Sequence, residues 1–142
     1  MKRTPLKRKT PLRRFAGQRR QRFNARPHTD MRTGETFGSK AELHRWESLE
    51  LMQRGGVIAD LTPHPKIILI AANGRAPEIA WRVDASYTRD GATIYEDTKP
   101  RPATRHETIL FKLWLHYGPG VLLIVDARGR ELKRIVPVKV RQ

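Results

Sequence analysis

The chain has 142 residues, which is enough for one domain with a hydrophobic core but not for two. It contains no cysteine, and this excludes a disulfide framework, a thiol nucleophile and a cysteine-ligated zinc site. No apolar run is long enough to cross a bilayer and the basic N-terminus lacks the apolar stretch of a signal peptide, so we expect no membrane partner.

The net charge of +15 is concentrated at the N-terminus. Residues 1–26 contain eleven Lys or Arg and no acidic residue, whereas residues 27–142 contain eighteen basic and fourteen acidic residues and carry only +4. The repeat of Thr-Pro-Leu at positions 4 and 10 and the scarcity of large apolar residues predict a disordered basic arm. A solubility or targeting tail is one interpretation. We favour binding of nucleic-acid phosphates through Lys2, Arg3, Lys7, Arg8, Lys9, Arg13 and Arg14.

The first foldable segment after the arm is a helix. Ser39 and Glu42 have capping-box spacing and Gly55-Gly56 is a stop signal, so a helix is predicted between them. Glu42 lies four residues before Trp46 on the apolar face, and this position directs its carboxylate toward the body of the protein.

The remaining elements alternate between strands and a second helix. In chain order they are a strand over 66–71 after an irregular approach, a hairpin of strands over 78–88 and 92–99, a helix over 104–117, a buried strand over 121–125 and an edge strand over 131–138. The apolar run at 121–125 suits a strand parallel to its neighbour after a helical crossover. This order predicts an α/β fold with a mixed central sheet and flanking helices.

The hairpin has a defined register. Asp90-Gly91 favours a two-residue type I′ turn, which places Asp84 opposite Asp97. Lys99 then lies on the same face, opposite Arg82.

Two carboxylates that face each other repel, by roughly 3 kcal/mol at about 5 Å and an effective dielectric constant near 20. Lys99 offsets part of this repulsion, and Mg²⁺ or Mn²⁺ would offset more because hard cations bind carboxylate oxygens. The alternative is the solvated face of an edge hairpin whose charges never meet. A three-residue bulged loop would also shift the register and break the pair.

Several short stretches follow one another in an order that resembles a known family. They are Ser39-Lys40-Ala41-Glu42, Gly56-Val57-Ile58-Ala59-Asp60-Leu61, His64-Pro65, Asp84 and Glu96-Asp97-Thr98-Lys99. Together with the order αβββαβ, they resemble the PD-(D/E)XK nuclease superfamily, closest to a small phage-associated branch of unassigned function. His64 stands where that branch usually has Gln, so its role stays open. Val83 rather than Pro precedes Asp84.

The resemblance implies a set of roles for these side chains. Asp84, Asp97, Lys99 and Glu42 would be catalytic, and the first two carboxylates would bind Mg²⁺ or Mn²⁺. The Thr98 carbonyl and Glu42 would be further ligands, and Lys99 would orient or deprotonate the attacking water. Glu42 could instead serve only as the helix cap.

The resemblance also implies a restriction-endonuclease-like core over residues 27–142 and an Mg²⁺-dependent endo- or exodeoxyribonuclease. Its expected partner is DNA, in phage or mobile-element recombination, repair or processing, in a bacterial or phage-infected cytoplasm. A homodimer is compatible with this role. Arg101 and Arg105 follow the acidic strand and are candidate phosphate contacts.

Two other function classes remain open at this point. One is a nucleic-acid-binding module that keeps the fold without cutting, and the other is a basic structural or assembly protein. The intact set of Asp84, Asp97 and Lys99 argues against the first, because a non-cutting copy would be free to lose one of them.

Overall fold

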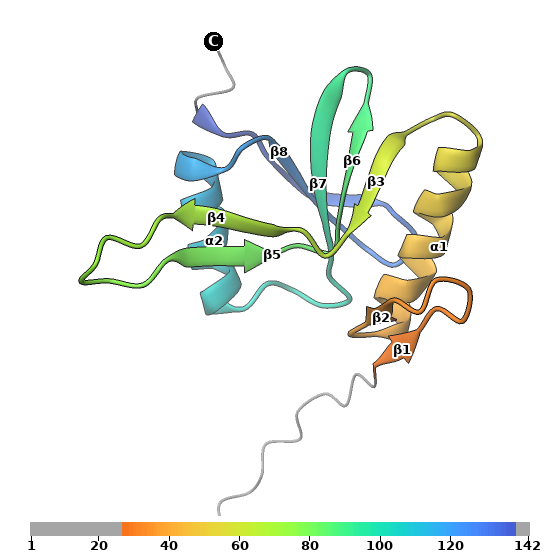
Figure 1. Cartoon of the computed structure of the whole chain (residues 1–142), viewed down its shortest axis with the longest axis horizontal. Helices are drawn as coiled ribbons and strands as arrows, with labels where there is room; N and C mark the ends of the chain where they lie inside the picture. Colours follow the sequence, from red (N-terminus) through yellow and green to blue (C-terminus); the bar gives the residue numbers. More distant parts are fainter. Residues whose placement is uncertain (1–26, 139–142) are drawn as a thin grey trace, which may run out of the picture.

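A computed structural model describes residues 27–138 of the chain. The predicted disordered arm over residues 1–26, with its seven candidate phosphate contacts, lies outside the described residues. The described part has a mixed α/β fold with two helices, a five-stranded mixed sheet and two small two-stranded sheets (Figure 1). None of its helices has the length and apolar character needed to span a bilayer.

The five-stranded sheet forms the centre of the fold. Its strands, in spatial order, are β3 (Ala59–Pro63), β6 (Ala85–Arg89), β7 (Ala92–Thr98), β8 (Val121–Val125) and β9 (Glu131–Ile135). The β7–β8 pair is parallel and the other pairs are antiparallel. This confirms the predicted buried parallel strand and places β9 at an edge of the sheet. The irregular approach predicted before residue 66 was wrong in part, because residues 59–63 of this approach form β3.

The two helices cover opposite faces of this sheet (Figure 1). Helix α1 (Lys40–Arg54) packs through Trp46 and Leu49 against Ala85 and Tyr87. Helix α2 (Arg105–Tyr117) crosses from β7 to β8 and packs against the other face. Its core cluster contains Phe111, Trp114, Leu122 and Ile124. Because side chains alternate along a strand, Glu96 of β7 points toward α1 and Asp97 points toward α2.

The β6–β7 hairpin has the predicted register. Tyr87 pairs with Ile94 and Arg89 with Ala92, and the two turn residues, Asp90 and Gly91, have φ angles of 50° and 77°. Positive φ at both turn positions is what a type I′ turn requires.

The prediction of one continuous strand over 78–88 was wrong, because the chain leaves the central sheet at Asp84. Val83 lies in the core cluster under α2, whereas Ala85 lies in the cluster under α1. A continuous strand would place these two residues on the same face. The chain therefore crosses from one face to the other between them.

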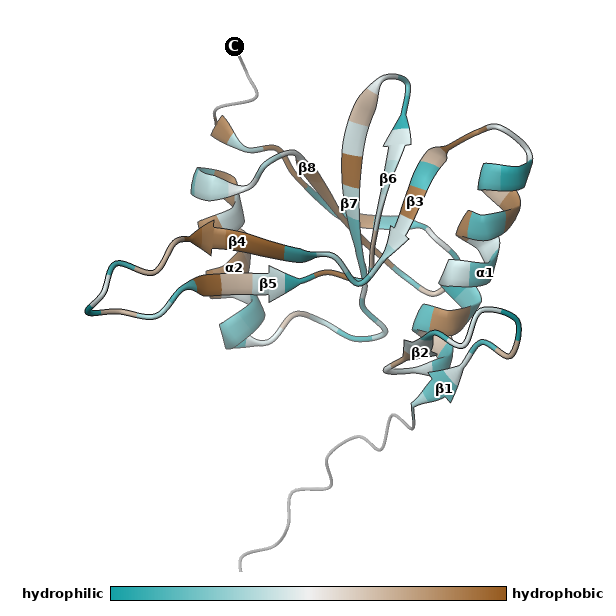
Figure 2. Cartoon of the chain, in the orientation of Figure 1, coloured by the Kyte–Doolittle hydropathy of each residue, from teal (hydrophilic) through white to brown (hydrophobic). Residues whose placement is uncertain are grey.

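The residues before this crossing form a separate hairpin, in which β5 (Ile79–Arg82) pairs with β4 (Lys66–Ile70). Arg82 consequently lies opposite Lys66. The register had predicted that it lies opposite Lys99, and this prediction was wrong. The hairpin projects beyond the sheet (Figure 1), and its β4 strand is strongly hydrophobic (Figure 2).

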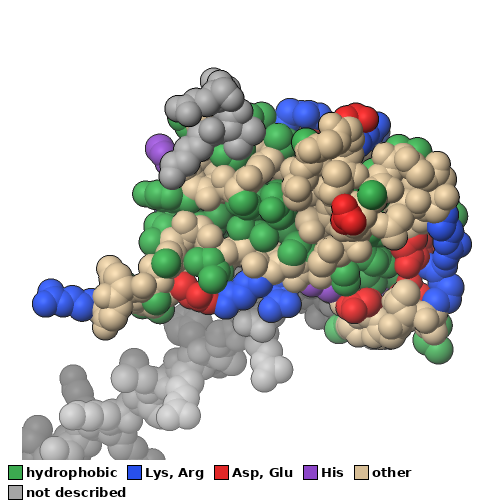
Figure 3. Space-filling model, turned by 45° about the horizontal axis from the view of Figure 1, so that its top comes forward, with side chains coloured by type: hydrophobic (Ala, Val, Ile, Leu, Met, Phe, Trp, Pro, Cys, Tyr) green, Lys and Arg blue, Asp and Glu red, His purple; other side chains and the backbone are tan. Residues whose placement is uncertain are grey.

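The β4–β5 hairpin is only partly buried. Leu69 and Trp81 reach the core beneath α2, whereas Ile68, Ile70 and Ile79 are exposed. Figure 3 shows hydrophobic side chains gathered on the side of the molecule from which this hairpin projects. A second small ribbon, β1 (His28–Thr29) with β2 (Thr36–Phe37), precedes α1 and contributes Phe37 to the core under that helix.

Candidate metal centre

Asp84 and Asp97 come together where β6 begins and β7 ends. The Asp84 amide donates to the Glu96 carbonyl at 3.1 Å, and Asp84 Oδ2 accepts from the Thr98 amide at 2.6 Å. Asp97 and Thr98 are almost fully buried, with relative exposures of 2% and 3%. The burial of Asp97 argues against a solvated hairpin face, and the two hydrogen bonds of Asp84 place it beside the end of β7 that carries Asp97, as the register predicted.

The pair holds an excess of negative charge in a poorly solvated place. Burial, followed by the charges of Asp97 and Glu42, raises the pKa of Asp84 to about 8, although the Thr98 amide and Lys99 oppose this rise. Burial also raises the pKa of Asp97, against the opposing effect of Lys99. A cation placed beside these carboxylates would therefore be stabilised.

Lys99 is held between two carboxylates. Its Nζ lies 2.7 Å from Asp97 Oδ2 and 3.2 Å from Glu107 Oε1. Burial opposes the charge of Lys99, but Asp97 and Glu107 together raise its pKa above the ordinary value. The lysine is therefore protonated at neutral pH, and in this state it acts as a hydrogen-bond donor and not as a base.

Glu107 is the functional candidate that the sequence interpretation missed. It is the third residue of α2, where its Oε2 accepts from the Thr104 amide at 2.6 Å in a capping box. Burial disfavours its charge, but the Thr104 amide, Arg101 and Lys99 together lower the pKa of Glu107 to about 2. The signal was available, because Thr104 and Glu107 have the same spacing as Ser39 and Glu42.

The two predicted phosphate contacts near this helix have different surroundings. Arg101 pairs with Glu107 through Nη1 at 3.1 Å, so part of its charge is already compensated. Arg105 is the first residue of α2 and is exposed.

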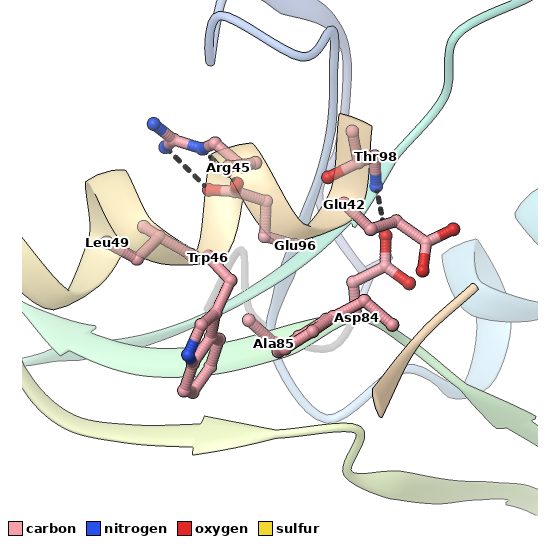
Figure 4. Close-up of a pocket in the computed structure, with 9 residues that line it drawn as sticks. Glu42, Arg45, Trp46, Leu49, Asp84, Ala85, Glu96 and Thr98 are labelled. Atoms are coloured by element: carbon pink, nitrogen blue, oxygen red, sulfur yellow. Dashed lines mark hydrogen bonds and ion pairs between the residues drawn. The ribbon is translucent and has the colours of Figure 1, made fainter. Parts of the chain in front are cut away.

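Glu42 both caps α1 and faces the carboxylate pair. Ser39 Oγ accepts from the Glu42 amide at 3.2 Å, as predicted, but the Glu42 carboxylate accepts from the Gly38 amide at 2.9 Å and not from that of Ser39. The same carboxylate lies beside Asp84 (Figure 4), and the two side chains line a cavity of about 10 Å³. That volume is about the minimum for one water-sized occupant.

On the opposite wall of this cavity, the negative charge of Glu96 is balanced by its neighbours. Glu96 accepts from Arg45 Nε at 2.6 Å and from the Tyr87 hydroxyl at 2.8 Å (Figure 4 shows the Arg45 contact). As the alternation of side chains predicted, Glu96 faces away from Asp97. We assign it a structural role, because its charge is already balanced.

His64 lies directly against the backbone of Asp84. Its amide donates to the Asp84 carbonyl at 3.0 Å, and its ring centroid lies 5.0 Å from that of Phe37. The backbone of His64 has a positive φ of 47°, and its buried Nε2 has no hydrogen-bond partner in the described part of the chain. The residue therefore helps to fix the crossing point that precedes Asp84.

The donor atoms of this site suit a hard divalent cation. Asp84 and Asp97 offer carboxylate oxygens, and Asp97 Oδ2 is at ion-pair distance from Lys99 but has no hydrogen bond of good geometry. Among residues 27–138, no three His, Asp or Glu side chains form a group that could hold a metal ion. Asp84 and Asp97 are the two carboxylates that the site offers, and Mg²⁺ usually retains several waters. Ligation by Glu42 and by the Thr98 carbonyl stays a prediction.

Comparison of the chain with known proteins adds no relationship. No protein-family model matches it, and a search of curated proteins finds no significant match.

Proposed function

We propose that this protein is a metal-dependent nuclease that hydrolyses phosphodiester bonds of DNA, on a restriction-endonuclease-like core. The observation that carries the proposal is the pair formed by the half-buried Asp84 and the buried Asp97, with the ammonium group of Lys99 bound to Asp97. Carboxylates, a lysine and a site that attracts divalent cations are the groups that this chemistry needs.

The cost of the carboxylate pair supports a functional interpretation. The pKa of Asp84 rises to about 8, so the fold is destabilised whenever both carboxylates are ionised. A neutral side chain at either position would remove this cost. Groups with strongly shifted pKa values that lie beside a charged partner are enriched at functional sites.

The residues of the chain would divide the work as follows. Asp84 and Asp97 would hold Mg²⁺ or Mn²⁺, which when bound supplies Lewis-acid polarisation of a phosphoryl oxygen and a water of lowered pKa. Lys99, as a protonated donor, would orient the attacking water or stabilise the charge that develops on the phosphoryl oxygens. Glu107 would position Lys99 from the side opposite Asp97.

The experiment is incubation of the full chain with labelled single-stranded, duplex, flap and junction DNA in Mg²⁺, in Mn²⁺ and in EDTA. We expect cleavage of at least one form with either metal and none in EDTA. Binding of DNA without cleavage under every condition would favour the non-cutting module instead. The absence of both binding and cleavage, for these DNA forms and for RNA, would overturn both proposals. The homodimer expected from the resemblance stays a prediction.

A further inference from the structure

An open cleft adjoins the candidate metal centre on the outer side of Lys99. It has a volume of about 720 Å³ and lies between the segment Lys99–Pro102, which leads into α2, and the turn Asp126–Arg130, which joins β8 to β9. Lys99 lines this cleft and also contacts Asp97, so the cleft lies next to the carboxylate site.

The β8–β9 turn is held in a fixed shape. The Asp126 carboxylate accepts from the amides of Arg128 at 2.9 Å and of Arg130 at 3.0 Å. Gly129 has a φ of 79° and packs so closely on α1 that a Cβ atom there would collide with the Arg45 guanidinium. The turn therefore presents its two arginines from a rigid support.

The lining of the cleft carries more basic than acidic side chains. Four basic side chains line it and Asp126 is the one acidic residue of the lining; the basic residues are Lys99, Arg101, Arg128 and Arg130. Arg130 pairs with Asp126 through Nε at 2.6 Å but is 75% exposed. The side chain of Arg128 is exposed and makes no ion pair with any described residue. The Arg128 guanidinium is therefore available to a solvent-borne anion, and the exposed Arg130 guanidinium is available in part, because Asp126 compensates some of its charge.

We propose that this cleft binds the phosphate backbone of the nucleic-acid strand that enters the candidate metal centre, and that Arg128 and Arg130 contact its phosphates. The inference rests on the proposed function and names the surface that positions its substrate. Arginine presents a planar fork that matches phosphate oxygens. The non-basic part of the lining is Pro100, Pro102, Asp126, Ala127 and Leu132, without an aromatic residue on which a base could stack. The cleft therefore offers contacts to phosphates and no stacking contacts to bases.

An acidic protein segment would satisfy the same charges, but the position of the cleft next to the carboxylate–lysine site favours nucleic acid. An acidic peptide that extended from the cleft would be repelled by two further carboxylates, Asp84 and Asp97. A phosphodiester strand would extend in that direction under the proposed function, since its scissile phosphate must reach the metal that these carboxylates would hold.

The test measures binding of the full chain to fluorescein-labelled duplex and single-stranded DNA by anisotropy, in EDTA to prevent cleavage, over a range of KCl concentrations. The cleft variant is Arg128→Gln with Arg130→Gln. The matched control is Arg75→Gln with Arg89→Gln, two exposed arginines at the tips of the two hairpins that lose the same charge. Arg128→Gln alone serves as a milder variant, because among residues 27–138 this side chain makes no hydrogen bond or ion pair.

For at least one of the two DNAs, we expect the negative slope of log affinity against log salt to become shallower. The change should be about 2 in the cleft variant, about 1 in Arg128→Gln and close to zero in the control. An equal change of slope in the control would mean that only the total charge matters. An unchanged slope in the cleft variant would mean that the cleft does not contact phosphate. Either result overturns the inference. Loss of poly-glutamate binding in the cleft variant with no change in DNA binding would do the same, in favour of an acidic partner.

This readout separates the inference from the proposed function. If the cleft variant shows the expected change of slope but the wild-type protein never cuts DNA, the result would support phosphate binding in the cleft and contradict the nuclease proposal. Cleavage of DNA by a protein whose slope is unaffected would support the nuclease and contradict the cleft.

Discussion

Replacement of Asp84 by Asn should stabilise the protein at alkaline pH but not at acidic pH. Asn keeps an oxygen that can accept from the Thr98 amide but removes the ionisable group. The pKa of Asp84 rises from 3.8 to about 8 on folding, so the folded protein retains a proton that the unfolded chain has already lost. The stabilisation that this proton provides is complete below about pH 4 and is lost as the pH rises through about 8.

The size of the effect follows from the shift. One pKa unit corresponds to about 1.4 kcal/mol, so the whole shift represents at most about 6 kcal/mol. Burial of the Asn amide also costs free energy, and we therefore expect the variant to gain roughly 3 kcal/mol at alkaline pH. The cost of the buried amide is the same at every pH, whereas only about 1.6 kcal/mol of the ionisation penalty has developed at pH 5, so near pH 5 the variant should be slightly less stable than wild type, by roughly 1 kcal/mol.

The assay is urea unfolding of wild type and variant in EDTA, near pH 5 and near pH 9. Asp90→Asn is the matched control, because Asp90 is almost fully exposed in the hairpin turn and loses the same charge. The reasoning is refuted if Asp84→Asn is no more stable than wild type near pH 9. It is also refuted if the difference between them is the same at both pH values.

Three further changes test the neighbouring groups. Lys99→Ala should lower turnover by on the order of a hundredfold with little loss of metal affinity, and Lys99→Arg should not restore the full rate, because a planar guanidinium does not reproduce the ammonium geometry; complete rescue by Arg would show that only charge matters. Glu107→Gln should destabilise the protein by about 2 kcal/mol at neutral pH in urea unfolding, a difference that should disappear as the pH falls from 4.5 toward 2; equal stability at neutral pH would argue against the Glu107 contacts. Deletion of residues 1–26 removes eleven cations, so DNA binding should weaken with a shallower salt slope while turnover at saturating DNA and the melting temperature stay close to wild type; an unchanged slope would show that the arm does not contact phosphate.

The parts of the fold that local signals determine could be predicted from the sequence. Asp90-Gly91 set the hairpin register, and the caps at Ser39 and Thr104 set the starts of both helices. Each of these signals acts through backbone geometry within a few residues, so no knowledge of the tertiary structure is needed.

The break at Asp84 could not be predicted in this way. Apolar residues alternate without interruption from Trp81 to Tyr87, and the same pattern fits one strand or two strands that pack on opposite faces. Only the placement of α1 and α2 decides between them. The strand over 59–63 was missed because Pro63 argues against a central strand, yet β3 lies at the edge of the sheet, where proline is tolerated.

The candidate site shows the same division. The register brought Asp84 to Asp97, but the contact between Glu107 and Lys99 depends on how α2 docks beside β7, which no local pattern encodes. The Thr104–Glu107 capping box marked the residue, whereas its role requires the three-dimensional structure.

The most direct test of the central claim is DNA cleavage and Mn²⁺ binding by Asp84→Asn and Asp97→Asn, measured beside wild type and Asp90→Asn in the same preparations. The account predicts that both site variants fold, bind DNA at least as tightly as wild type, lose cleavage and bind Mn²⁺ more weakly, while Asp90→Asn behaves as wild type. Wild-type cleavage in either site variant would contradict the assignment of Asp84 and Asp97 as the carboxylates that hold the metal.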